Sequence, residues 1–102
     1  MRFLFKARMS TDTANAHARE GTLGTTLQSI LEEIQPEAAY FGAESGRRTM
    51  YLVVDLQSTS QIPAIAEPLF LSLRAEVEFQ PVMLPEDLQE AGPAIESAAR
   101  RF

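Results

Sequence analysis

Hydrophobic and polar residues alternate along two stretches near the ends of the chain. Residues 2–9 and 75–84 place apolar side chains at every second position, for example at Phe3, Phe5 and Ala7. A period of two is typical of a strand that buries one face. We therefore predict that both stretches are half-buried strands of one sheet.

Two further strands are predicted in the middle of the chain. Residues 38–43 and 49–56 flank a turn at residues 44–46, where glycine permits the positive φ of a tight hairpin. The strand at 49–56 is apolar even on its second face, which carries Tyr51 and Val53. Such a strand predicts that other parts of the protein, or a partner, cover both faces of the sheet.

Apolar residues at helical spacing predict helices between the strands. Residues 22–35 form a firm helix, preceded by a short helix or a loop over residues 11–20. The next helix should bend at Pro68, which leaves the Ala64 carbonyl without its usual donor. Its apolar stripe, which we expect to be buried, comprises Ile62, Ile65, Ala66, Leu69, Phe70 and Leu73.

Residues 85–102 predict a terminal helix that the Gly92-Pro93 pair bends or breaks. Leu88, Ile95 and Phe102 lie seven residues apart and share one side of it. This helix could dock on its own chain or on a partner.

The element order is β-α-β-β-α-β-α, which predicts one α+β domain over residues 1–102. Two right-handed crossovers around a central hairpin give an antiparallel βαββαβ sheet with helices on one face. The first and last strands become neighbours, so the basic residues of the first face Glu76 and Glu78. The other face is open and partly apolar. We therefore expect a homodimer in which two open sheet faces pack about a two-fold axis.

The composition is that of an acidic globular protein. Its formal net charge of −5 opposes nucleic-acid binding, because the chain repels phosphates. The absence of cysteine excludes disulfides and thiolate metal sites. No stretch reaches the roughly 20 apolar residues of a membrane helix, and the start does not resemble a signal peptide. We expect no nucleic-acid or membrane partner and a cytoplasmic location.

Three segments resemble proteins of a known superfamily. They are PEAAYF (residues 36–41), IPAIAEPLF (residues 62–70) and the closing run EFQPVMLPEDLQEAGPAIESAARRF. With the element order, they resemble the dimeric α/β-barrel superfamily of ferredoxin-like protomers, which includes muconolactone isomerase-like, antibiotic-biosynthesis monooxygenase-like and stress-responsive barrel proteins. The resemblance implies a dimer, and a cavity between sheet and helices for a small aromatic or lactone compound. It implies no particular reaction, because the fold hosts many.

His17 is the one histidine of the chain, so an acid–base step near neutral pH would fall to it. It precedes the apolar stripe of the helix at 22–35, a position that fits a cavity mouth. The alternative is an exposed helix histidine beside Glu20. One histidine needs carboxylate partners to hold a metal, and we expect neither a metal nor another cofactor.

Tyr40 and Tyr51 lie on the two strands of the hairpin. A ring with a polar tip suits a pocket for an aromatic ligand, although such tyrosines also simply pack in sheets. Glu67, beside Pro68, adds a carboxylate to an acceptor-rich rim or is a plain surface residue. Together with Phe70, these residues are the candidate ligand site.

Three classes of function follow. The favoured one is a small-molecule-binding or regulatory domain, because the sequence has no convergent set of titratable residues. The second is a cofactor-free isomerase or monooxygenase for a small aromatic or lactone compound, with His17 in its cavity. The third is a structural or partner-docking protein, in which Leu88, Ile95 and Phe102 would stay exposed.

Overall fold

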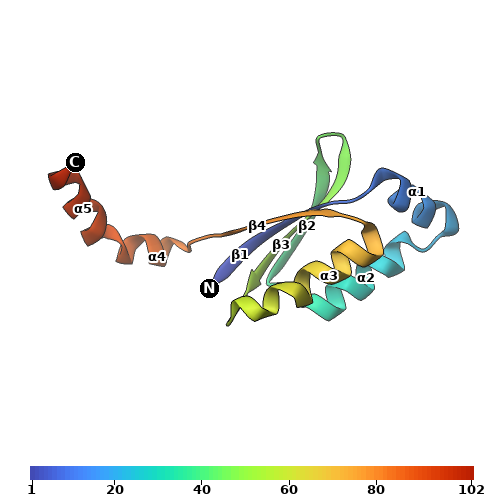
Figure 1. Ribbon diagram of the computed structural model, residues 1–102, viewed down its shortest axis with the longest axis horizontal. Helices are drawn as coiled ribbons and strands as arrows, with labels where there is room; N and C mark the ends of the chain where they lie inside the picture. Colours follow the sequence, from blue (N-terminus) through green and yellow to red (C-terminus); the bar gives the residue numbers. More distant parts are fainter.

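A computed structural model describes residues 1–102 as a sheet, a layer of helices and a projecting arm (Figure 1). The strands are β1 (Arg2–Arg8), β2 (Ala38–Glu44), β3 (Arg47–Asp55) and β4 (Glu76–Pro81). They form one antiparallel sheet in the order β2-β3-β1-β4. The prediction of an α+β domain with four antiparallel strands is confirmed.

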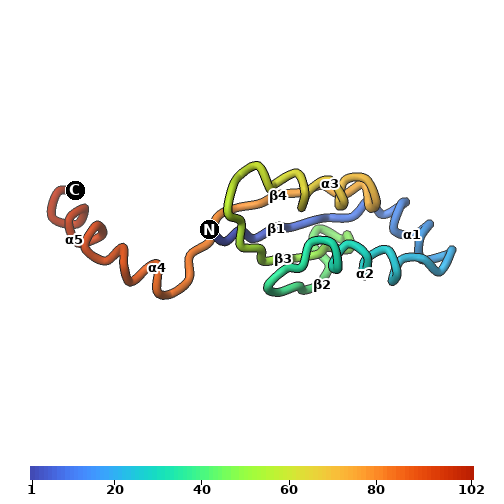
Figure 2. The backbone as a smooth tube through the Cα atoms, turned by 90° about the horizontal axis from the view of Figure 1, so that it is seen from below, coloured from blue at the N-terminus to red at the C-terminus, as the bar shows by residue number.

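Helices cover one face of this sheet. α2 (Leu23–Ile34) and α3 (Ile62–Leu73) lie side by side, α1 (Thr11–Glu20) lies at one end, and the short 3-10 helix η1 (Thr59–Gln61) leads into α3 (Figures 1 and 2). The segment predicted as a short helix or a loop is thus a helix, and α3 continues through Pro68. None of the helices combines the length and the apolar character needed to cross a membrane.

Local signals in the sequence determine where these elements begin and end. The Ser10 side chain accepts a hydrogen bond from the Thr13 N–H at the start of α1. Gly21, with a φ of 77°, ends that helix in the left-handed conformation. Ser45 and Gly46 have φ values of 53° and 75°, and positive φ at both positions suits the tight turn between β2 and β3.

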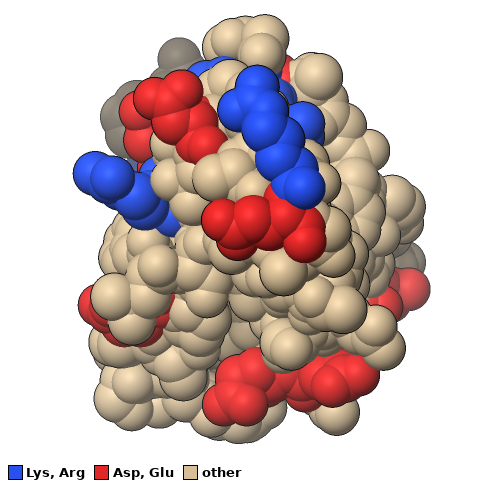
Figure 3. Space-filling model, turned by 90° about the vertical axis from the view of Figure 1, so that its right-hand side faces the viewer, with Lys and Arg blue, Asp and Glu red and all other residues tan.

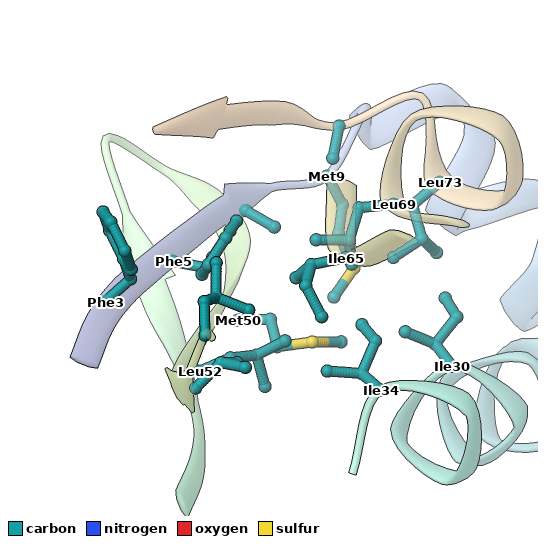
Figure 4. Packing of buried hydrophobic residues seen from close by; sticks show 14 of the residues in the cluster. Phe3, Phe5, Met9, Ile30, Ile34, Met50, Leu52, Ile65, Leu69 and Leu73 are labelled. Atoms are coloured by element: carbon teal, nitrogen blue, oxygen red, sulfur yellow. The ribbon is translucent and has the colours of Figure 1, made fainter. Parts of the chain in front are cut away.

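The core fills the space between the sheet and helices α2 and α3 (Figure 4). The core side chains labelled in Figure 4 are Phe3, Phe5, Met9, Ile30, Ile34, Met50, Leu52, Ile65, Leu69 and Leu73. No surface hollow is lined by residues of α2 or α3. The region where the family resemblance implies a cavity is therefore packed with side chains.

Phe70 corrects the predicted buried stripe of α3. Its side chain is 42% exposed, whereas the preceding Leu69 is fully buried. One residue along a helix turns a side chain by about 100°. Because Leu69 points at the sheet, Phe70 lies on the flank of the helix.

The C-terminal arm, residues 82–102, projects beyond the end of β4. Its helices α4 (Pro85–Glu90) and α5 (Gly92–Arg101) stand clear of the sheet and the other helices (Figures 1 and 2). The radius of gyration is 17.0 Å, whereas a compact chain of this length has about 13 Å. The predicted break occurs at Ala91, because Pro93 fits the first turn of a new helix, where its missing N–H costs little.

Candidate functional site

The sheet face that no helix covers, called the open face below, is the candidate site. The strand register aligns Leu4, Val53 and Ala38 into a row across β1, β3 and β2. All three side chains are only half-buried. An apolar row that remains partly exposed at the centre of a sheet is suited to contact another layer or a ligand.

The neighbouring row of the open face is aromatic and basic. Tyr51 lies opposite Tyr40 on one side and Lys6 on the other. Tyr40 is 64% exposed, whereas Tyr51 is half-buried. A Cβ atom at Gly42 would lie 3.6 Å from Cε2 of Tyr51, so the Tyr51 ring rests beside this glycine. The row offers two ring surfaces next to a cation.

Beyond this row, Arg8 is the centre of a network of ion pairs. Its Nη1 lies 2.7 Å from Oε2 of Glu44, and its Nη2 also pairs with Glu78. Lys6 joins the network, because its Nζ lies 3.0 Å from Oε1 of Glu44. The Arg8 side chain is only 17% exposed, so its neighbours replace much of its contact with water. These charges are satisfied within the chain.

Acid is expected to weaken the fold through the carboxylates of this network. The hydrogen bond from Lys6, followed by that from Arg8, lowers the pKa of Glu44 below its ordinary value of 4.5. Since folding lowers this pKa, the ionised form stabilises the fold above about pH 4.5, and that contribution is lost as the pH falls through the folded value. Glu44→Gln should therefore reduce the loss of melting temperature between pH 6 and pH 3, measured by circular dichroism.

The matched control for this prediction is Glu33→Gln, a change of the same kind on the exposed surface of α2. With this substitution, the melting temperature should fall between pH 6 and pH 3 as much as it does in the unmodified protein. An equal effect of the two substitutions would show that the ion pairs of Glu44 contribute nothing specific.

His17 lies away from the open face and connects three helices. Its Nδ1 is 2.9 Å from Oγ1 of Thr22, just before α2, and its Nε2 is 3.1 Å from the carbonyl oxygen of Ser72 in α3. The side chain is half-buried, so it is not the exposed histidine considered as an alternative. The shallow hollow beside it is lined by α1 alone. Both ring nitrogens thus have partners within the chain.

The residues predicted to form a ligand site lie in two layers. Tyr40 and Tyr51 share the open face, whereas Glu67 and Phe70 belong to α3 in the helical layer. Glu67 and Phe70 are exposed on that helix. The structure brings together the two tyrosines and separates them from the other two residues.

Sequence reasoning located part of the charged network and missed one member. The register places Lys6 opposite Glu78 and Arg8 opposite Glu76, as the alternation predicted. Glu44 was assigned to a turn, but it is the last residue of β2 and reaches across β3 to β1. No short-range signal in the sequence reveals such a contact.

Charges of both signs also lie at one end of the molecule. Figure 3 views the end of the molecule formed by α1 and the β2–β3 hairpin, where basic and acidic side chains lie next to one another. No broad basic surface is visible on this side. No group of three or more histidine, aspartate or glutamate side chains is placed to hold a metal ion.

The fold defines a small α+β protein whose sheet has one open face. Among solved structures, it is similar to 5-chloro-2-hydroxyhydroquinone dehydrochlorinase (TftG) from Burkholderia phenoliruptrix AC1100, in complex with 2,5-dihydroxybenzoquinone. The TM-score is 0.60 at 15% sequence identity, over 84% of this chain and 97% of that one. At this identity the similarity concerns the fold. No protein-family model matches the chain, and no curated protein does.

Proposed function

We propose that the protein is a homodimeric small-molecule-binding domain. In this proposal the protomer is ferredoxin-like, two open faces pack together as in a dimeric α/β barrel, and a small apolar or aromatic ligand binds between them. The strand order β2-β3-β1-β4 supports the ferredoxin-like assignment. The observation that carries the proposal is the half-exposed row of Leu4, Val53 and Ala38, which a second copy can cover with the same row.

A planar aromatic compound with oxygen substituents is the class of ligand that suits this face. Tyr40 and Tyr51 offer ring surfaces for stacking, and the Lys6 ammonium can donate a hydrogen bond to a ligand oxygen. The TftG structure contains a ligand of similar shape, 2,5-dihydroxybenzoquinone, which is a planar quinone ring with oxygen substituents. Its similar fold therefore supports the choice, although the reaction of TftG is not transferred to this chain.

A binding role is favoured over an isomerase or monooxygenase. His17 already uses both ring nitrogens in contacts that connect the helices. On the open face, Lys6 and Arg8 are paired with carboxylates, and there is neither a histidine nor a cysteine. Apart from the hydroxyls of Tyr40 and Tyr51, the face offers no unpaired group for acid–base or nucleophilic chemistry.

Tyr51→Leu is expected to weaken binding of 2,5-dihydroxybenzoquinone by about two- to tenfold. The change removes a stacking interaction of about 0.5–1.5 kcal/mol and keeps an apolar side chain in the sheet. Ligand-observed NMR on the intact protein would measure the dissociation constant. The matched control is Phe70→Leu, which removes a partly exposed ring from α3. Equal weakening by the two variants, or no binding to the unmodified protein, would contradict the open-face site.

A further inference from the structure

Apolar residues recur along the C-terminal arm in alternating steps of four and three positions. They are Leu84, Leu88, Ala91, Ile95, Ala98 and Phe102. This spacing gathers side chains into a seam of the kind by which one helix packs on another. The large members are exposed, with Leu88 at 50%, Ile95 at 55% and Phe102 at 102%. The arm therefore carries a contact surface that its own chain leaves uncovered.

The base of the arm forms a receiving surface, called the elbow here. A hollow at this point is lined by Pro81, Val82, Met83, Leu84, Pro85 and Leu88. Glu86 and Asp87 make the first turn of α4 acidic. The Asp87 carboxylate accepts a hydrogen bond from the Leu84 N–H at 2.9 Å, so the chain itself holds the elbow in shape. The elbow is thus an apolar hollow with an acidic border.

The tip of the arm is basic and aromatic, and so complements the acidic border and the apolar hollow of the elbow. Arg100 and Arg101 end α5, and the aromatic Phe102 that follows is fully exposed. Tip and elbow of one arm stand apart, because α4 and α5 follow each other away from the sheet (Figure 1). We propose that two copies of this chain clasp their arms, with the tip of each seated at the elbow of the other.

If the two arms run antiparallel, every apolar residue of the seam has an apolar partner on the other arm. The pairs are Leu84 with Phe102, Leu88 with Ala98 and Ala91 with Ile95. In the two inner pairs a large side chain meets a small one, which allows the helices to approach closely. α4 of each copy then packs along α5 of the other, and the two arms cross near their bends at Ala91. Each arm contributes its six seam residues together with the charged residues at tip and elbow. The clasp therefore adds a second contact to the dimer.

A charge exchange tests the clasp on the full chain. Arg100→Glu combined with Arg101→Glu places acids on both contacting surfaces, and should raise the dissociation constant of the dimer about tenfold or more. Glu86→Lys should do the same with basic residues, because the antiparallel pairing places Glu86 opposite Arg100. Asp87 is kept, because it caps α4. The variant with all three changes should recover most of the original association, since opposite charges face each other again.

The control is Glu33→Lys on the exposed surface of α2, which changes the net charge as much as the elbow variant does. It should leave association unchanged in sedimentation equilibrium. Recovery by the triple variant separates pairing from damage to the helices, because helix-end effects of the separate changes would add instead of cancelling.

The clasp is overturned if the triple variant dissociates as the tip and elbow variants do, if neither the tip nor the elbow variant changes association, or if the unmodified protein is a monomer. The inference rests on the homodimer of the proposed function but not on its sheet contact. Val53→Lys tests that sheet contact and leaves the arm intact. If the charge-exchange variants associate against expectation while the protein still binds its ligand normally, the clasp alone would therefore be rejected.

Discussion

Replacing Val53 by lysine is expected to raise the dissociation constant of the sheet-to-sheet dimer by about a hundredfold or more. Val53 lies between Leu4 and Ala38 in the apolar row of the open face. In the proposed dimer, the new ammonium group would be trapped between two sheets without a partner. An unpaired buried charge costs about 3–5 kcal/mol, and each 1.4 kcal/mol is a factor of ten. Sedimentation velocity over a range of concentrations would measure the effect.

The same substitution is harmless if the open face is bare. A lysine at this half-buried position of a bare face can extend its ammonium group into water, so the variant should remain folded by circular dichroism. Gln28→Lys on the exposed side of α2 adds the same charge and should leave association unchanged. A Val53→Lys protein that associates as strongly as the unmodified one would show that the sheets do not meet.

Phe5→Ala is expected to lower the free energy of unfolding by about 3–5 kcal/mol. The Phe5 side chain is fully buried, and its ring stacks on that of Phe79 at 5.3 Å with an interplanar angle of 18°. Phe3 completes the cluster, with its ring centroid 6.4 Å from that of Phe5 and 5.9 Å from that of Phe79. Alanine would lose this buried area and leave a cavity at the centre of the sheet. Since domains are stable by about 5–15 kcal/mol in total, the variant should lose a large share of its stability.

The matched control is Phe70→Ala, the same chemical change at a position that is 42% exposed on α3. It removes less buried area and leaves no enclosed cavity, so it should cost about 1 kcal/mol or less. Urea unfolding followed by circular dichroism would measure the two variants side by side. If Phe70→Ala were as damaging as Phe5→Ala, the described division between core and surface would be incorrect.

Short-range patterns were sufficient to predict the strands and most helix ends. The alternation through Phe3 and Phe5 identified the buried face of β1, because successive side chains of a strand point to opposite faces. Gly46 marked the hairpin, because glycine accepts the positive φ of a tight turn. Even the opposition of Lys6 and Glu78 followed from the element order, since the crossovers make β1 and β4 neighbours.

The candidate ligand site was predicted less well. Tyr40 and Tyr51 lie opposite each other, but Glu67 and Phe70 belong to the other layer. Which layer an α3 side chain faces depends on the rotation of the helix against the sheet, as the contrast between Leu69 and Phe70 shows. Periodicity identifies an apolar stripe, but it does not define the edges of that stripe to a single residue.

The alternation of residue types, the turn residues and the helix caps thus define the elements of this protein, because each depends on neighbours within a few positions along the chain. The contact from Glu44 across β3 to Lys6, the connection of three helices by His17 and the freely projecting arm emerge only when the chain is folded. The first two depend on residues far apart in sequence, whose distances are set by how the layers stack. The arm projects because the folded layers leave it without a surface to pack on.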